Sequence, residues 1–176
     1  MVPTGDGPTQ VERSESGIIR HPSTVYGASQ GGNALNVWLP DNEKPAILVM
    51  AAMHGDEPET TVVLSEALRA IRRGSLKNAV ILSANPDGLC LGTRGNANGV
   101  DLNRNFPASN WAPEILFYKS RKAGPRDIAI SPGARPASEP ETQALLRLID
   151  DLQPLAVITL HAGSQGSWIT WKTWPS

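Results

Sequence analysis

Residues 45–74 read PAILVMAAMHGDEPETTVVLSEALRAIRRG. Residues 45–53 form a nearly continuous apolar run, which is typical of a β-strand covered on both faces. Apolar residues then recur at helical spacing over residues 58–73, and Gly74 is placed to end that helix. A buried strand followed closely by an amphipathic helix indicates an α/β unit with a polar turn between its two elements.

The same pattern continues on both sides of this stretch. Further strands are predicted at 34–40 (ALNVWLP), 78–84 (NAVILSA) and 155–160 (LAVITL). A second helix is predicted from the capping-box spacing of Ser138 and Glu141 to Pro154, with an apolar stripe along its length. Strands alternating with helices predict an α/β fold with a largely parallel or mixed sheet flanked by helices.

Composition limits the class of protein. The chain has 176 residues, of which 40% are hydrophobic and 19% charged, and it is long enough for one domain with a core. Sixteen Lys+Arg against seventeen Asp+Glu give no electrostatic case for nucleic acid or an anionic membrane. The single cysteine, Cys90, excludes an internal disulfide. The polar N-terminus shows no signal peptide or membrane span, so a cytoplasmic protein is expected; the oligomeric state stays open.

Three segments are expected along the chain. Residues 1–24, rich in Gly, Pro, Ser and Thr, are expected to form a loose leader. Residues 25–161 are expected to form the domain, and residues 162–176 a tail of different character. Within the domain, residues 85–137 carry many Gly, Asn and Pro with little periodicity, so they are expected to form a long irregular region of the kind that often carries function.

Two of the three histidines directly follow predicted strands, His54 after 45–53 and His161 after 155–160. Ligands of open α/β sheets gather beyond the carboxyl ends of strands. Glu57 lies one helical turn from His54, so both side chains can point to one centre. Two His and one Glu are a known zinc-ligand set that leaves a position for water. The alternative is that His54 and Glu57 only cap the helix while His161 is satisfied at a strand end.

A loop rich in glycine and asparagine follows the strand at 78–84: residues 85–107 read NPDGLCLGTRGNANGVDLNRNFP. It contains Arg94 and Arg104, and its glycines let the backbone approach a ligand closely. The planar fork of arginine suits a substrate carboxylate or the oxyanion of a tetrahedral intermediate. Such a loop is ordinary in isolation, but its combination with the metal-ligand spacing favours a catalytic site.

The motifs occur in a recognisable order. They are H-x-x-E at 54–57, N-P-D-G at 85–88, R-G-N-x-N-G-V-D-L-N-R-N-F-P at 94–107, S-E-P-E-T-Q-A-L at 138–145, and a strand ending in histidine. This set resembles the M14 zinc carboxypeptidases over about residues 26–161. Within them it is most similar to bacterial members that cleave the bond between γ-D-glutamate and meso-diaminopimelate in murein tripeptide. The resemblance implies a zinc-carboxypeptidase-like fold, one zinc ion per chain and a small peptide substrate.

The resemblance also implies residue roles. The implied zinc ligands are His54, Glu57 and His161. Asp101 matches the acid that orients the first zinc histidine. Arg94 matches the arginine that polarises the scissile carbonyl and stabilises the oxyanion. Asn103 and Arg104 match the pair that grips the terminal carboxylate of the substrate. In such a metallopeptidase, zinc lowers the pKa of the water that attacks the carbonyl.

The chain departs from the family pattern after His161, where it reads AGSQGSWITWKTWPS. Family domains continue further and supply a glutamate that acts as general base and acid, and commonly a tyrosine. Here no Asp or Glu follows Asp151, and three of the five tryptophans fall in the last nine residues. We therefore expect a truncated or frame-shifted chain that lacks the C-terminal part of the family fold.

Two other functions fit parts of the sequence. N-acyl-amino-acid deacylases of the aspartoacylase or succinylglutamate desuccinylase type also carry H-G-x-E and D-L-N-R. The N-P-D-G stretch, the second Asn of LNRN and SEPETQAL favour the murein peptidase instead. A catalytically inactive zinc- or peptide-binding fragment is the third candidate, because a downstream acid is missing.

Overall fold

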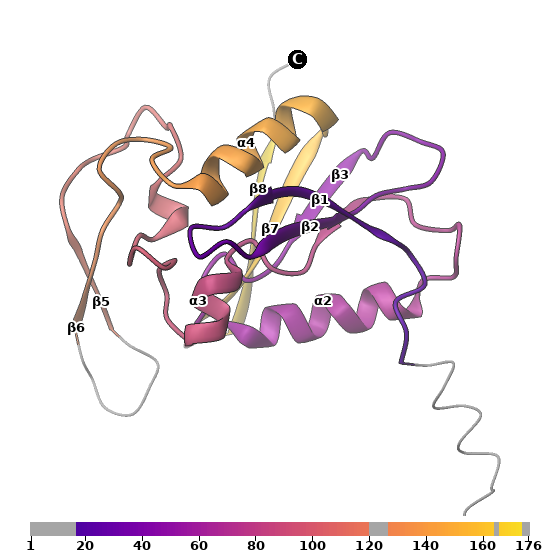
Figure 1. Ribbon diagram of the computed structural model, residues 1–176, viewed down its shortest axis with the longest axis horizontal. Helices are drawn as coiled ribbons and strands as arrows, with labels where there is room; N and C mark the ends of the chain where they lie inside the picture. Colours follow the sequence, from indigo (N-terminus) through magenta and orange to yellow (C-terminus); the bar gives the residue numbers. More distant parts are fainter. Residues whose placement is uncertain (1–16, 120–126, 164–165, 174–176) are drawn as a thin grey trace, which may run out of the picture.

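The computed structural model describes residues 17–119, 127–163 and 166–173, and there a mixed sheet lies between helices on both faces (Figure 1). Six strands in this part of the chain are ordered β1-β2-β4-β3-β7-β8. They are β1 (Ser23–Ala28), β2 (Ala34–Trp38), β3 (Ile47–Met50), β4 (Ala79–Ile81), β7 (Ala156–Gly163) and β8 (Gly166–Thr173). The central strand β3 is parallel to β4 and to β7, and the outer pairings are antiparallel. The predicted α/β fold with a mixed sheet is confirmed.

Two helices cover the two faces of this sheet. Helix α4 (Pro140–Leu152) packs Leu145 and Leu148 against Leu48 of β3 in one core cluster. Helix α2 (Pro58–Ala70) packs Leu64 and Leu68 into a second cluster. Figure 1 shows these helices on opposite sides of the strands. The apolar spacing of each helix is therefore explained, because one stripe is buried and the rest meets solvent.

The ends of the chain contribute strands beyond those predicted. β1 begins at Ser23, inside the segment 1–24 expected to be a loose leader, and residues 1–16 lie outside the described residues. β8 lies within 162–176, the segment expected to be a tail, and pairs antiparallel with β7. No helix among the described residues has the length and apolar character needed to cross a membrane.

The region at 85–137, expected to be long and irregular, is in part regular. This region contains α3 (Pro86–Leu91), the 3₁₀ helix η1 (Leu102–Arg104), and the antiparallel strands β5 (Leu116–Lys119) and β6 (Asp127–Ile130). α3 is shorter than two turns, so it leaves no periodic signal. Its signal is the start itself, where Pro86 opens the helix and the Asn85 side chain accepts a hydrogen bond from the Gly88 N–H.

The capping box predicted for Ser138 and Glu141 is also wrong. The N-cap residue of α4 is Glu139, and its side chain makes no capping hydrogen bond. The Ser138 hydroxyl instead donates to Glu139 Oε1 (2.6 Å), and Glu141 Oε1 accepts the backbone N–H of Gln30 (2.9 Å). A bond between neighbouring residues and a bond to the distant Gln30 therefore replace the reciprocal pair that the spacing suggests.

Asp87, in the N-P-D-G stretch, fastens the turn between β1 and β2 to α3. Its Oδ1 accepts from Ser29 Oγ and Asn33 Nδ2, and its Oδ2 accepts from the Gly31 N–H, each at 2.7 Å. Burial alone would raise the pKa of Asp87, but these hydrogen bonds outweigh burial and lower it below its ordinary value of 3.8. The charged form of Asp87 therefore stabilises the folded chain.

We expect Asp87→Asn to lower the free energy of unfolding by about 1–3 kcal/mol at neutral pH, because an amide cannot accept all three bonds. Since the pKa is lowered by folding, the wild-type contribution is present above the ordinary pKa and is lost as the pH falls through the folded-state pKa. The difference between variant and wild type should therefore shrink in acid. Urea unfolding at neutral and acidic pH checks this, with the exposed Asp41→Asn as control. A difference that does not change with pH would contradict it.

Candidate metal centre

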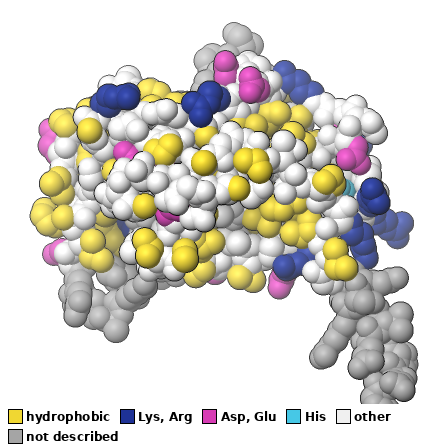
Figure 2. All heavy atoms as spheres, viewed as in Figure 1, with side chains coloured by type: hydrophobic (Ala, Val, Ile, Leu, Met, Phe, Trp, Pro, Cys, Tyr) yellow, Lys and Arg dark blue, Asp and Glu magenta, His cyan; other side chains and the backbone are white. Residues whose placement is uncertain are grey.

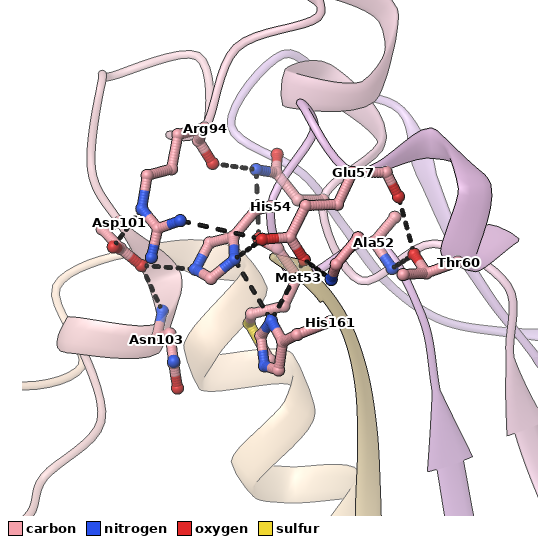
Figure 3. A network of polar contacts seen from close by, with 11 residues as sticks. Ala52, Met53, His54, Glu57, Thr60, Arg94, Asp101, Asn103 and His161 are labelled. Atoms are coloured by element: carbon pink, nitrogen blue, oxygen red, sulfur yellow. Dashed lines mark hydrogen bonds and ion pairs between the residues drawn. The ribbon is translucent and has the colours of Figure 1, made fainter. Parts of the chain in front are cut away.

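Two neighbouring parallel strands bring His54 and His161 to one edge of the sheet. Met50 of β3 pairs with Thr159 of β7, and His161 follows two residues later on β7. The chain leaving β3 bends at Ala52, whose φ is +47°, and this bend directs the following turn over the strand ends. Figure 3 shows both imidazoles and the Glu57 carboxylate pointing toward one another.

The distances between these side chains fit a metal ion. His54 Nδ1 lies 2.9 Å from Glu57 Oε1, and His161 Nδ1 lies 3.2 Å from both His54 Nδ1 and Glu57 Oε2. Ligand atoms around a tetrahedral zinc ion lie about 3.4 Å apart, given bonds of about 2.1 Å. Among the described residues, this group of His, Cys, Asp or Glu side chains is the one that could hold a metal.

The alternative in which Glu57 only caps the helix finds no support. Glu57 does precede α2 at the N-cap position, but its side chain makes no capping hydrogen bond. Instead, Glu57 Oε2 accepts the backbone N–H of Ala162 (3.0 Å). Burial would raise the pKa of Glu57, but its hydrogen bonds with His161 and His54 outweigh burial and hold that pKa well below its usual range. Glu57 is thus a carboxylate at neutral pH, the form that binds a cation.

Asp101 lies behind His54 and fixes the imidazole ring. Its Oδ1 lies 3.1 Å from His54 Nε2 and also accepts the backbone N–H of Asn103 (2.9 Å). When the Nε2 proton is directed to Asp101, His54 Nδ1 is the nitrogen left to bind a metal ion beside Glu57 and His161. Burial would raise the pKa of Asp101, but the His54 hydrogen bond and the nearby His54 and Arg94 charges lower it to about 2. A carboxylate behind a histidine in this way orients a metal ligand.

Arg94 lies at the rim of the same cluster. Its Nε donates to Asp101 Oδ2 (2.9 Å), and its Nη1 lies 3.7 Å from Glu57 Oε1. Its Cζ lies 4.4 Å from the centre of the Tyr118 ring, a cation–π contact. The ion pair with Asp101 and the contact with the Tyr118 ring together position the guanidinium. Its terminal N–H groups are thereby presented beside the three candidate ligands.

Asn103 and Arg104 extend the site away from the metal ligands. Both residues belong to η1, have exposed side chains, and line a cavity of about 420 Å³. All seven candidate residues from the sequence therefore lie in one region. Sequence reasoning missed Tyr118 and the Ala162 N–H, because neither belongs to a motif; Tyr118 reaches Arg94 from the separate β5-β6 sheet, and Ala162 lies on β7 beside β3.

Gly55 lies between His54 and Glu57 at a point of close backbone approach. A Cβ atom added to Gly55 would overlap the backbone carbonyl of Gly88 in α3. Only a glycine fits here without moving either the ligand turn or α3. The glycine in H-G-x-E is therefore required by the packing of this turn against α3.

We expect Gly55→Ala to lower the free energy of unfolding by at least about 2 kcal/mol, because backbone and not a flexible side chain must move. A matched control is Gly32→Ala, where φ is +82° but no atom lies within 4 Å of the added Cβ. In that control the free energy of unfolding should fall by only about 1 kcal/mol, which is the cost of a left-handed backbone for alanine. Denaturant unfolding measures both. Equal losses would show that the close approach at Gly55 is unimportant.

Comparison with known proteins agrees with this geometry. A family model described as zinc carboxypeptidase, Peptidase_M14, matches residues 25–174. Murein peptide amidase A of Escherichia coli K12 is 43% identical over 152 residues, which are 85% of this chain and 62% of that protein. Murein peptide amidase A of Vibrio campbellii is 39% identical over 153 residues, 86% of this chain and 62% of that protein. The chain thus spans less than two thirds of the length of these relatives.

A solved structure shares the fold. The crystal structure of murein-tripeptide amidase from Escherichia coli O157 superposes with a TM-score of 0.80 at 40% identity. The match covers 86% of this chain and 65% of that one. The predicted zinc-carboxypeptidase-like architecture is therefore confirmed for the part of the fold that the chain spans.

Proposed function

The chain belongs to the M14 family of zinc carboxypeptidases, and on that basis we propose that it binds one zinc ion and hydrolyses murein peptides. The proposed ligands are His54, Glu57 and His161. The proposed scissile bond joins γ-D-glutamate to meso-diaminopimelate. The observation that carries this proposal is the convergence of the three candidate ligands with Arg94 and Asp101 in one cluster.

Zinc in such a site acts as a Lewis acid toward the scissile carbonyl and activates water for attack. With zinc bound, Asp101 would accept the Nε2 proton of His54 and so leave the Nδ1 lone pair for the metal. Arg94 presents N–H groups where the carbonyl oxygen gains negative charge, and its ion pair with Asp101 sets its direction in advance. Asn103 and Arg104 hold the carboxylate next to the scissile bond. The chain thereby orients the substrate at both ends of the reacting amide.

The names of the relatives support the substrate class. Two proteins at 43% and 39% identity, and a solved structure at 40%, are amidases of murein peptides. A substrate of this kind has a carboxylate beside the scissile amide, which suits the arginine and amide side chains of η1. The product amino acid leaves with that carboxylate still attached.

The test is hydrolysis of L-alanyl-γ-D-glutamyl-meso-diaminopimelate by the zinc-supplemented chain, with released diaminopimelate measured by mass spectrometry. N-acetylaspartate and N-succinylglutamate are assayed in parallel. We expect release from the tripeptide, at least about 10²-fold slower than by an intact family member because no Asp or Glu follows Asp151 to act as general base, and none from the N-acyl amino acids. A His54→Ala/His161→Ala preparation, purified in the same way, reports any contaminating peptidase.

The remaining outcomes separate the competing functions. Hydrolysis of the N-acyl amino acids without the tripeptide would identify a deacylase. Stoichiometric zinc binding without hydrolysis of any of the three would identify a zinc-binding fragment. Either result would contradict the proposed function.

A further inference from the structure

One buried residue of helix α2 contacts both ends of the turn that carries the first two candidate ligands, here called the ligand turn (residues 52–57). Thr60 lies in the first turn of α2. Its hydroxyl donates to the backbone carbonyl of Glu57 (2.8 Å) and accepts the backbone N–H of Ala52 (3.1 Å), as Figure 3 shows. A single hydroxyl group therefore joins the start of the ligand turn to its end.

Ala52 depends on such a contact because its backbone lies in the left-handed region. Its φ of +47° is unfavourable for a residue that has a Cβ atom. Ala52 has no exposed surface, so its backbone polar groups must find partners inside the protein. Its carbonyl accepts the backbone N–H of Asn85 (2.9 Å), and its own N–H donates to Thr60. Without the hydroxyl, this N–H would be buried and unpaired at a residue whose conformation is already unfavourable.

A role confined to the helix explains only half of this arrangement. Serine and threonine in helices commonly donate to a carbonyl three or four residues earlier, and the bond from Thr60 to Glu57 is of that kind. The bond from Ala52 is different, because Ala52 precedes the helix and lies eight residues before Thr60. This second bond fixes the ligand turn and adds nothing to the helix itself.

We propose that Thr60 is a positioning residue for the metal centre, whose hydroxyl holds the ligand turn in the binding geometry before a metal ion is present. The inference rests on the proposed function, because it takes His54 and Glu57 as zinc ligands. Ala52 lies two residues before His54, and the carbonyl that Thr60 contacts belongs to Glu57 itself. A change of backbone direction at Ala52 or Glu57 displaces a ligand atom that must reach the ion.

The test compares the zinc affinities of folded variants by competition with a chromophoric chelator. Thr60→Val keeps the shape of the side chain but removes the hydroxyl. Residues that orient metal ligands contribute about 10–100-fold to affinity, and we expect Thr60→Val to weaken zinc binding by about tenfold. Thr60→Ser keeps the hydroxyl and should bind zinc as the wild type does. Valine is compatible with α2, which already carries exposed Val62 and Val63; Figure 2 shows hydrophobic side chains on the surface where α2 lies.

The matched control is Thr61→Val, at the next position of α2. The Thr61 hydroxyl also donates a hydrogen bond, but its acceptor is the carbonyl of Leu82 (2.9 Å), outside the ligand turn. Both valine variants should unfold at a lower urea concentration than the wild type, because each loses a hydroxyl hydrogen bond. Only Thr60→Val should lose zinc affinity. A general loss of stability is thereby separated from a loss of ligand positioning.

A second measurement needs no metal ion. Amide hydrogen exchange in the metal-free chain reports whether the Ala52 N–H is held in its hydrogen bond. We expect exchange at Ala52 to be faster in Thr60→Val than in the wild type or in Thr61→Val. The neighbouring Ala51 N–H donates to the carbonyl of Ile81 (2.9 Å) and should keep its protection, so it serves as the internal reference.

The variant Ala52→Gly tests the link to backbone conformation. Glycine adopts a left-handed conformation without a steric cost, so in that background the ligand turn depends less on the Thr60 hydroxyl. The loss of zinc affinity caused by Thr60→Val should shrink from about tenfold to about threefold when residue 52 is glycine. The same background keeps the inference testable if Thr60→Val does not fold alone.

Failure of the inference and failure of the proposed function give different results. If the wild type binds zinc and Thr60→Val binds it equally well, Thr60 does not position the ligands, although the proposed metal site stands. An equal loss in Thr60→Ser and Thr60→Val would also overturn the inference, because the hydroxyl would not be the cause. If the wild type does not bind zinc, the proposed metal site is itself contradicted, and the inference fails with it.

Discussion

Replacing His54 and His161 together by alanine is expected to abolish stoichiometric zinc binding. These residues supply two of the three proposed ligand atoms, and Glu57 alone cannot hold zinc at comparable affinity. Loss of a residue that only orients a ligand weakens metal binding by about 10–100-fold, so loss of two ligands should weaken it by more than about 100-fold. Competition with a chromophoric chelator measures the affinity, and elemental analysis measures the occupancy.

The third histidine provides the control. His21 is buried outside the cluster, and its backbone carbonyl accepts the indole N–H of Trp38 (3.1 Å), a bond that a side-chain substitution leaves in place. His21→Gln should therefore bind zinc as the wild type does. Circular dichroism of the double variant shows whether its fold persists. Full zinc occupancy in a folded double variant would refute the proposed metal site.

Substitution of Arg94 and of Arg104 should produce different kinetic defects, although both residues come from one loop. Arg94 points its terminal N–H groups toward the candidate ligands, where negative charge develops only near the transition state. In a form extended with a family-type C-terminal segment, Arg94→Gln should therefore lower kcat by about 10²–10³-fold. Arg104 meets a carboxylate that is present before and after the reaction. Arg104→Gln should mainly raise KM, by about 10–100-fold, with a smaller change in kcat.

Steady-state kinetics on the murein tripeptide separate the two effects. Because Arg94 Nη1 lies 3.7 Å from Glu57 Oε1, zinc affinity of Arg94→Gln is measured as well, so that loss of metal is not mistaken for loss of oxyanion stabilisation. The control Arg73→Gln, at an exposed position after α2, should leave both constants unchanged. The same kinetic defect in both loop variants would count against the assigned roles.

The sequence predicted four strands of the sheet and its two long helices because these elements depend on contiguous residues. The apolar run at 45–53 contains β3, and the spacing at 58–73 contains α2. Such periodicity records which face of an element is buried, and burial is the main driving force for that element. α3 is too short to show a period, and β5 and β6 pair outside the main sheet. Their sequences therefore carry no periodic pattern of burial from which they could be predicted.

The candidate site was predicted in identity but not in geometry. Residue types and spacing, with the family resemblance, are enough to identify His54, Glu57, Arg94, Asp101 and His161 as candidates. Local rules were less reliable where polar side chains had distant partners. Glu141 has the spacing of a helix-capping residue, but its carboxylate accepts hydrogen bonds from Gln30 and Asn96, residues far from it in the chain.

The sequence by itself thus determined four strands of the sheet, the two long helices and the candidate ligands, since each follows from neighbouring residues or a short motif. The tertiary structure alone decided which distant groups meet. Asp101 reaches His54 across 47 residues, and Tyr118 reaches Arg94 from a separate two-stranded sheet. These contacts depend on strand order and on the path of the loop over the sheet. No local window contains that information, because it arises from the simultaneous burial of all the elements.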